Sequence, residues 1–278
     1  MSAGGEVVVN GVRLAFDVRG AGSETVVLAG HIGAPGSASL PAQVPALVDA
    51  GYRVITFDPR GIPPSDVPPP PYSVAEMAAD AAGLIAEVAT GPVAMVGYSM
   101  GALVTQELAL MRPDLLRCAV LLGTLARKDV MRRALFAASL ASLRSGQRMP
   151  RDLSAVVGAL QLFGPARLDD DQWAKTYLDS ALVDNDANVD WQGLLGQQEA
   201  TAAYDERLDA LAAITAPVLV VGFELDLLVP AKLSREVAGA IPGARYVEIA
   251  GCGHAGPSEL PEQINALILE FLAEFRPA

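Results

Sequence analysis

Three residue types that can together activate a nucleophile occur at separate places in the chain. Ser99 is the centre of a Gly-x-Ser-x-Gly pentapeptide at residues 97–101, and His254 lies among glycines at 251–256. Asp226 lies between them in sequence. A serine hydroxyl is a weak nucleophile that needs a neighbouring base, and the base needs an acid to orient it. The three residues therefore predict covalent acyl transfer through a serine.

The elements around these residues can bring them together. An apolar run at 93–96 predicts a strand directly before Ser99, and 100–111 is typical of a helix. So tight a strand-to-helix turn needs small neighbours, and it exposes the serine hydroxyl at a helix N-terminus. Asp226 and His254 also follow predicted strands, at 218–221 and 246–249. We expect all three at the carboxyl ends of the strands, where open α/β sheets place their sites.

The remaining runs predict a doubly wound α/β fold with a mostly parallel sheet. Near-continuous apolar runs suit strands that are buried on both faces of a parallel sheet. Asn10-Gly11 favours an antiparallel hairpin at the N-terminus. The other predicted strands are 7–9, 12–18, 25–29, 52–57 and 118–122, and the other predicted helices are 43–47, 74–88 and 261–275.

The alternation of strands and helices stops between residues 125 and 213. Nothing in this stretch is typical of a strand, and apolar residues recur there at helical spacing. We expect four helical stretches, the last from Leu194 to Leu211. The predicted organisation is an α/β core formed by residues 1–124 and 214–278, with an inserted helical cap at 125–213.

Composition excludes several classes of protein. The formal net charge is −12 at pH 7, which disfavours nucleic acid or an anionic membrane as a partner. Two cysteines are too few for a disulfide scaffold or a four-cysteine zinc site. We see no secretion signal, and no apolar run approaches the roughly 18–20 residues that span a bilayer. We therefore expect a soluble, cytoplasmic protein.

The pentapeptide, the acid loop, the histidine loop and the helical insertion occur in the order found in the α/β-hydrolase superfamily, which the chain resembles over nearly its whole length. The resemblance is to esterases and enol-lactonases with a helical cap. It implies Ser99 as nucleophile, Asp226 as acid and His254 as general base. It also implies an oxyanion hole, with one N–H donated by Met100 and another by a loop at 29–36.

The oxyanion loop departs from the family's His-Gly-x pattern. His31 matches the family histidine, and Gly33 then matches the donor position, but Ile32 stands where the family has glycine. Either Ile32 or Gly33 could be the second donor, and we favour Gly33. We expect His31 to hold this loop through hydrogen bonds.

Some residues have competing interpretations. Glu224 is the rival of Asp226 as the acid. The Asp-to-Pro spacing of the loop resembles the family's, and this resemblance favours Asp226. Cys252 is too close to His254 in sequence for a nucleophile and base pair.

His31, Ile32 and Trp173 are our candidates for substrate binding. Three further cap aromatics could line the pocket or simply pack, namely Phe136, Phe163 and Trp191.

We predict a serine hydrolase that cleaves a carboxylic ester, lactone or thioester of a small acyl substrate and needs no cofactor or metal. The alternatives are an acyltransferase or lactone-forming cyclase of secondary metabolism, a cofactor-free haloperoxidase or perhydrolase, and a non-catalytic scaffold. A basic run at 127–151 is either a solvated helix face or a docking face for an anionic carrier such as coenzyme A or an acyl carrier protein.

Overall fold

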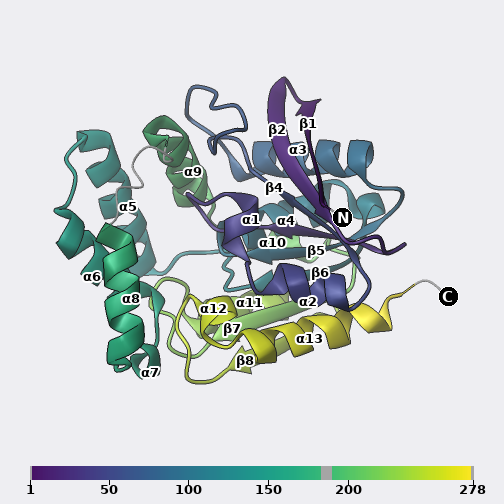
Figure 1. The fold of residues 1–278 in the computed structure, drawn as a ribbon. Coiled ribbons are helices and arrows are strands. Elements are labelled where there is room, and N and C mark those ends of the chain that lie inside the picture. The colour runs from purple at the N-terminus through teal and green to yellow at the C-terminus, as the bar shows by residue number, and fades with distance from the viewer. Residues whose placement is uncertain (1, 183–189, 277–278) are drawn as a thin grey trace.

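The computed structural model describes residues 2–182 and 190–276, which form a single eight-stranded sheet flanked by helices (Figure 1). The strand order is β1-β2-β4-β3-β5-β6-β7-β8. The strands are β1 (Ser2–Val9), β2 (Val12–Arg19), β3 (Thr25–Ala29), β4 (Arg53–Phe57), β5 (Val93–Tyr98), β6 (Leu116–Leu122), β7 (Val218–Phe223) and β8 (Arg245–Ile249).

The antiparallel pairings of the sheet both involve β2. β1 and β2 are joined by a two-residue turn in which Asn10 and Gly11 both have positive φ, at 50° and 74°. Such a turn matches the twist of the paired strands. β2 pairs antiparallel with β4, and from β4 to β8 every neighbouring pair is parallel. The predicted fold class is therefore confirmed.

Side chains of the central strands alternate between two apolar layers. In β5, Val93 and Met95 face one layer, whereas Ala94 and Val96 face the other. Helices α3 (Val74–Val88), α4 (Met100–Met111) and α11 (Ala231–Ala240) cover the first layer. Helices α2 (Gln43–Asp49) and α13 (Pro261–Glu274) cover the second. Burial on both faces explains why these strands are near-continuous apolar runs in the sequence.

The local sequence marks the start of two of these helices. Ser73 accepts a hydrogen bond from the backbone of Glu76, whose side chain in turn accepts one from the Ser73 backbone, so α3 begins with a capping box. Pro261 occupies the first turn of α13. The shorter elements of the core are α1 (Gly36–Ser39), a 3₁₀ turn at Pro113–Leu115 and α12 (Gly256–Glu259).

The described part of the chain between β6 and β7 is helical, and we call residues 125–213 the cap segment. Its helices are α5 (Val130–Ser145), α6 (Arg151–Leu162), α7 (Pro165–Leu168), α8 (Asp171–Leu182), α9 (Trp191–Ala203) and α10 (Leu208–Leu211). Helices α5 to α8 stand beside one end of the sheet, and α9 lies between them and the core (Figure 1).

Two details differ from the predicted elements. The fourth helical stretch is broken, because α9 ends at Ala203 and α10 begins only at Leu208. Helix α11 was not predicted, since its apolar residues are few and widely spaced. In the described ranges, no helix combines the length and the apolar character that crossing a bilayer requires.

Candidate active site

Ser99 occupies a sharp turn between β5 and α4. Its φ of 55° and ψ of −117° are unusual for a residue with a side chain. Glycines on both sides allow the turn. A Cβ atom at Gly97 would lie 2.4 Å from the carbonyl oxygen of Gly101, and one at Gly101 would lie 2.1 Å from that of Ala29. The close approach of three backbone segments therefore explains the Gly-x-Ser-x-Gly pattern.

The structure brings Ser99, His254 and Asp226 into one hydrogen-bonded chain. Nε2 of His254 lies 2.9 Å from Oγ of Ser99, and Nδ1 lies 2.6 Å from Oδ2 of Asp226. The side chains of His254 and Asp226 are 4% and 0% exposed. An imidazole held at Nδ1 by a buried carboxylate presents Nε2 as a base to the serine hydroxyl.

Backbone donors hold the acid in place. Oδ1 of Asp226 accepts the backbone N–H groups of Leu228 and Val229, at 2.8 and 2.7 Å, which leaves Oδ2 to His254. The rival acid, Glu224, points elsewhere: its carboxylate accepts the backbone N–H of Gly251 at 2.9 Å. Of the two candidates, Asp226 is the one that meets His254.

The oxyanion loop requires a correction. The backbone N–H of Gly33, the favoured donor, is already bonded to Oε1 of Gln197 at 2.9 Å. Ile32 lines the cavity next to Ser99 and Met100. Across the described residues, the backbone N–H groups of Ile32 and Met100 meet no protein acceptor. The geometry therefore favours Ile32 over Gly33, because the insertion of Gln197 from α9 occupies the Gly33 donor.

His31 lies behind this loop rather than in the cavity. Its backbone N–H donates to Oγ of Ser39 at 2.6 Å, and its Nδ1 lies 2.9 Å from the carbonyl oxygen of Ile32. Its ring stands edge-on to Tyr98, whose hydroxyl donates to the carbonyl of His254 at 2.9 Å. Burial lowers the pKa of His31. A neutral His31 that holds the loop fits its predicted structural role, and it does not line the cavity as a substrate-binding residue would.

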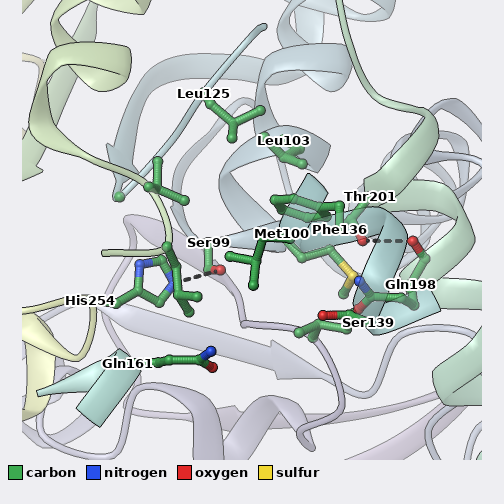
Figure 2. A pocket seen from close by; sticks show the side chains of 15 residues that line it. Ser99, Met100, Leu103, Leu125, Phe136, Ser139, Gln161, Gln198, Thr201 and His254 are labelled. Carbon is green, nitrogen blue, oxygen red and sulfur yellow. Dashed lines mark hydrogen bonds between the residues drawn. The ribbon is translucent and has the colours of Figure 1, made fainter. Parts of the chain in front are cut away.

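A cavity of about 200 Å³ opens onto Ser99 and His254 (Figure 2). Apolar side chains form most of its wall. The core contributes Ile32, Ser99, Met100, Leu103, Gly123, Leu228, Val229 and His254, and the cap segment contributes Leu125, Leu135, Phe136, Ser139, Gln161, Gln198 and Thr201. Apart from His254, none of these residues is ionisable.

Among the predicted aromatic residues, only Phe136 lines the cavity. Trp173 instead stacks on Tyr177 with ring centroids 5.2 Å apart, and Phe163 packs edge-on to it at 4.5 Å. Trp191 is 37% exposed and lies against the guanidinium of Arg148. Trp173 therefore packs against other cap aromatics and does not line this cavity, so the structure does not support its assignment to substrate binding.

Cys252 is completely buried, and burial raises the pKa of its thiol to about 12. A thiol in this state is a poor nucleophile. The structure therefore agrees with the choice of Ser99 over Cys252.

Several arginines of the basic run at 127–151 form ion pairs, most of them with acids outside the run. The ion pairs are Arg127–Glu236, Arg132–Asp129, Arg133–Asp205 and Arg144–Glu199. Lys128 is buried, and its Nζ donates to the backbone carbonyl of Tyr204. This pairing favours a salt-bridged surface over a docking face, and binding of coenzyme A or an acyl carrier protein stays a prediction.

Several residues of the site carry no recognisable signal in the sequence. Gln161, Gln198, Ser139 and Thr201 reach the cavity from cap helices, and Gln197 bridges the oxyanion loop to the carbonyl of Arg60. No motif surrounds these residues, and each is an ordinary polar residue in a helical pattern. Only the docking of the cap segment on the core brings them to the site.

The comparisons with known proteins agree with this geometry. The family model of the alpha/beta hydrolase fold matches residues 27–259. The chain therefore belongs to the α/β-hydrolase fold family.

Three relatives illustrate the range of activities among similar chains. The "Putative non-heme bromoperoxidase BpoC" of Mycobacterium tuberculosis is 38% identical over 95% of this chain and 99% of its own. Its crystal structure superposes with a TM-score of 0.89, covering 98% of both chains. The "Putative carbamate hydrolase RutD" of Azorhizobium caulinodans is 30% identical over 94% of this chain and 95% of its own. The enol-lactonase of Burkholderia xenovorans LB400 is 26% identical, with a TM-score of 0.83 over 97% of this chain and 100% of its own.

Proposed function

We propose that this protein is a serine hydrolase that cleaves a small, uncharged carboxylic ester or lactone through an acyl-enzyme on Ser99. The observation that carries this proposal is the hydrogen-bonded chain from Ser99 through His254 to Asp226 at the mouth of an apolar cavity. An activated serine beside an apolar wall fits an acyl group better than a highly charged substrate.

In the proposed reaction, His254 takes the proton of Ser99 as the hydroxyl oxygen attacks the substrate carbonyl. Asp226 keeps the proton of the neutral imidazole on Nδ1 and stabilises the imidazolium that forms. His254 then gives the proton to the departing alcohol, and a water molecule attacks the acyl-enzyme by the same route. The reaction closes with a free acid, a free alcohol and the original Ser99.

The backbone N–H groups of Ile32 and Met100 are the proposed donors to the oxyanion. Both border the cavity beside Ser99, and Met100 begins α4, where the helix dipole favours negative charge. A donor of this kind is worth about 3–4 kcal/mol of barrier. We propose the cap segment as the lid of the site, since helices α5, α6 and α9 supply much of the cavity wall.

The test is intact mass after incubation with a fluorophosphonate, which phosphonylates activated serines. A single adduct on the wild type that is absent from Ser99→Ala would support the mechanism, and activity against small esters and lactones should follow. An unlabelled wild type with no esterase or lactonase activity would contradict it. Product analysis with an added alcohol separates hydrolysis from acyl transfer or lactone formation.

Perhydrolysis is the second candidate, because BpoC, at 38% identity, is named as a bromoperoxidase. Hydrogen peroxide would attack the acyl-enzyme in place of water and release a peracid, which oxidises bromide to hypobromite and returns the carboxylic acid. Bromination that requires peroxide and acetate together, and that is lost in Ser99→Ala, would support this activity.

A further inference from the structure

Gln161 is a polar side chain of the cavity that the proposed chemistry does not use. It projects from the last turn of α6, and in Figure 2 it lies on the His254 side of Ser99. The polar residues Ser139, Gln198 and Thr201 lie on the opposite side of Ser99 in that view. Within the described ranges, no protein group forms a hydrogen bond with the carboxamide of Gln161. The cavity wall on the His254 side thus contains a hydrogen-bond donor and an acceptor, both from the Gln161 carboxamide, that have no protein partner among the described residues.

The residues that follow Gln161 are tied to the loop that carries His254. The carbonyl oxygen of Leu162 accepts the backbone N–H of Ala255 at 2.8 Å. The Glu259 carboxylate bridges the two segments: Oε2 accepts the N–H of Gly164 at 2.9 Å, and Oε1 accepts the N–H of Gly253 at 2.8 Å. Glu259 is only 8% exposed.

Close packing makes this connection rigid. A Cβ atom at Gly253 would lie 2.6 Å from the carbonyl oxygen of Leu162, and one at Gly164 would lie 2.9 Å from that of Gly251. Arg167 of α7 adds a hydrogen bond at 3.1 Å to the backbone carbonyl of Glu259. Since the end of α6 is joined to the His254 loop at these points, Gln161 cannot shift without moving the loop.

We propose that Gln161 binds the alcohol portion of the substrate and that Glu259 is the positioning residue that holds it beside His254. This inference rests on the proposed hydrolase function. His254 must give its proton to the leaving oxygen, so the alcohol portion lies on the His254 side of Ser99. A carboxamide there selects an alcohol with an uncharged hydroxyl or carbonyl group near the ester oxygen.

The test compares propyl butyrate with 2-hydroxyethyl butyrate. The two esters have the same acyl group, and their alcohol portions end in a methyl group and a hydroxyl group respectively. Deacylation is common to both esters, so discrimination must appear in kcat/KM and not in the breakdown of the acyl-enzyme. A hydrogen bond of ordinary strength predicts that the wild type prefers the hydroxylated ester by about tenfold. Gln161→Leu should abolish this preference by lowering kcat/KM for the hydroxylated ester, so the ratio of kcat/KM for the two esters is the readout.

Glu259→Gln should lose the same preference, because a carboxamide can accept only one of the two backbone N–H groups with its oxygen and presents a donor to the other. The matched controls are exposed residues, Gln172→Leu on α8 and Glu262→Gln on α13, which should keep the wild-type ratio. Thermal melting checks the fold of Glu259→Gln, and Gln161→Leu tests the substrate contact independently of that result.

The outcomes separate the two levels of the proposal. A wild type that is not labelled by the fluorophosphonate and hydrolyses neither ester contradicts the hydrolase function, and the role of Gln161 with it. If the fluorophosphonate labels the wild type but Gln161→Leu has the same ratio of kcat/KM for the two esters, the role of Gln161 alone is overturned. The same conclusion follows if the labelled wild type hydrolyses neither ester.

Discussion

The core and the cap segment bury their side chains very differently. Every residue of β3, β5 and β7 is buried, as are most residues of α4. Helix α5 in the cap segment has no buried residue, and large apolar side chains there are open to solvent: Val130 is 86% exposed, and Leu160 of α6 is 54% exposed. The core is thus packed from both sides, whereas the cap helices are packed from one.

The two regions also differ in the roles proposed for their side chains. The groups proposed for bond breaking, Ser99, Asp226 and His254, all come from the tightly packed core. The polar side chains that would distinguish substrates come from the cap segment. This segment meets the core through polar contacts such as those of Gln197 and Glu259, and through apolar residues such as Ala200 and Leu211. Substitutions in the core should therefore reduce turnover and stability far more than comparable substitutions in the cap segment.

The largest contrast should be in turnover. Asp226→Asn keeps an acceptor for the backbone but turns an amide donor toward Nδ1 of His254, which forces the imidazole proton onto Nε2 and removes the base. We expect kcat to fall about 10⁴-fold, against about tenfold in kcat/KM for a cap substitution such as Gln161→Leu. Steady-state kinetics on 2-hydroxyethyl butyrate measures both effects. A fall below tenfold in Asp226→Asn would contradict its assignment as the acid.

Ion pairs should show the next largest contrast. Arg60 and Asp80 form a buried pair in the core, with side chains 8% and 2% exposed and a distance of 2.6 Å. Asp80→Ala leaves the buried Arg60 with only the half-exposed Glu76 as an acidic partner and should lower the free energy of unfolding by about 3 kcal/mol. The exposed cap pair Lys175–Asp179 should contribute under about 0.5 kcal/mol, so Asp179→Ala is the matched control. Urea unfolding of the two variants compares them directly.

Replacing a glycine by alanine should change the free energy of unfolding in opposite directions in the two regions. At Gly101 a Cβ would press on the carbonyl of Ala29, so Gly101→Ala should destabilise the protein by about 3 kcal/mol. At Gly158, within α6, the nearest atom to a Cβ is the Tyr177 hydroxyl at 3.4 Å, an ordinary contact. Gly158→Ala should therefore stabilise its helix by about 1 kcal/mol. Equal shifts in the two urea midpoints would argue against the contrast.

Lys128 lies where the core joins the cap segment and should give the smallest effect. It is 3% exposed, and burial lowers its pKa to about 8. Above pH 8 the unfolded chain retains a proton that the folded chain has lost, so stability rises with pH. Between pH 7.5 and 9 this group should contribute an increase of about 1 kcal/mol in the free energy of unfolding. Urea unfolding of Lys128→Met at both pH values should lack this increase.

The fold and much of the site were predictable because their requirements are local. A strand buried on both faces must be apolar at successive positions, as at 93–96 and 218–221, and a turn as sharp as that at Ser99 must have small neighbours. The hairpin needs residues that accept positive φ, and Asn10-Gly11 provides them. These patterns predict that the loops carrying Ser99, Asp226 and His254 each follow a strand of the sheet.

The sequence by itself thus determined the class of fold and the three residues of the hydrogen-bonded chain. Only the tertiary structure decided which backbone N–H faces the cavity and which cap residues line it. Gln197 reaches Gly33 across 164 residues, and Glu259 reaches Gly164 across 95. Contacts at such separations depend on how whole helices dock, and that geometry leaves no periodicity or spacing in the sequence that could reveal it.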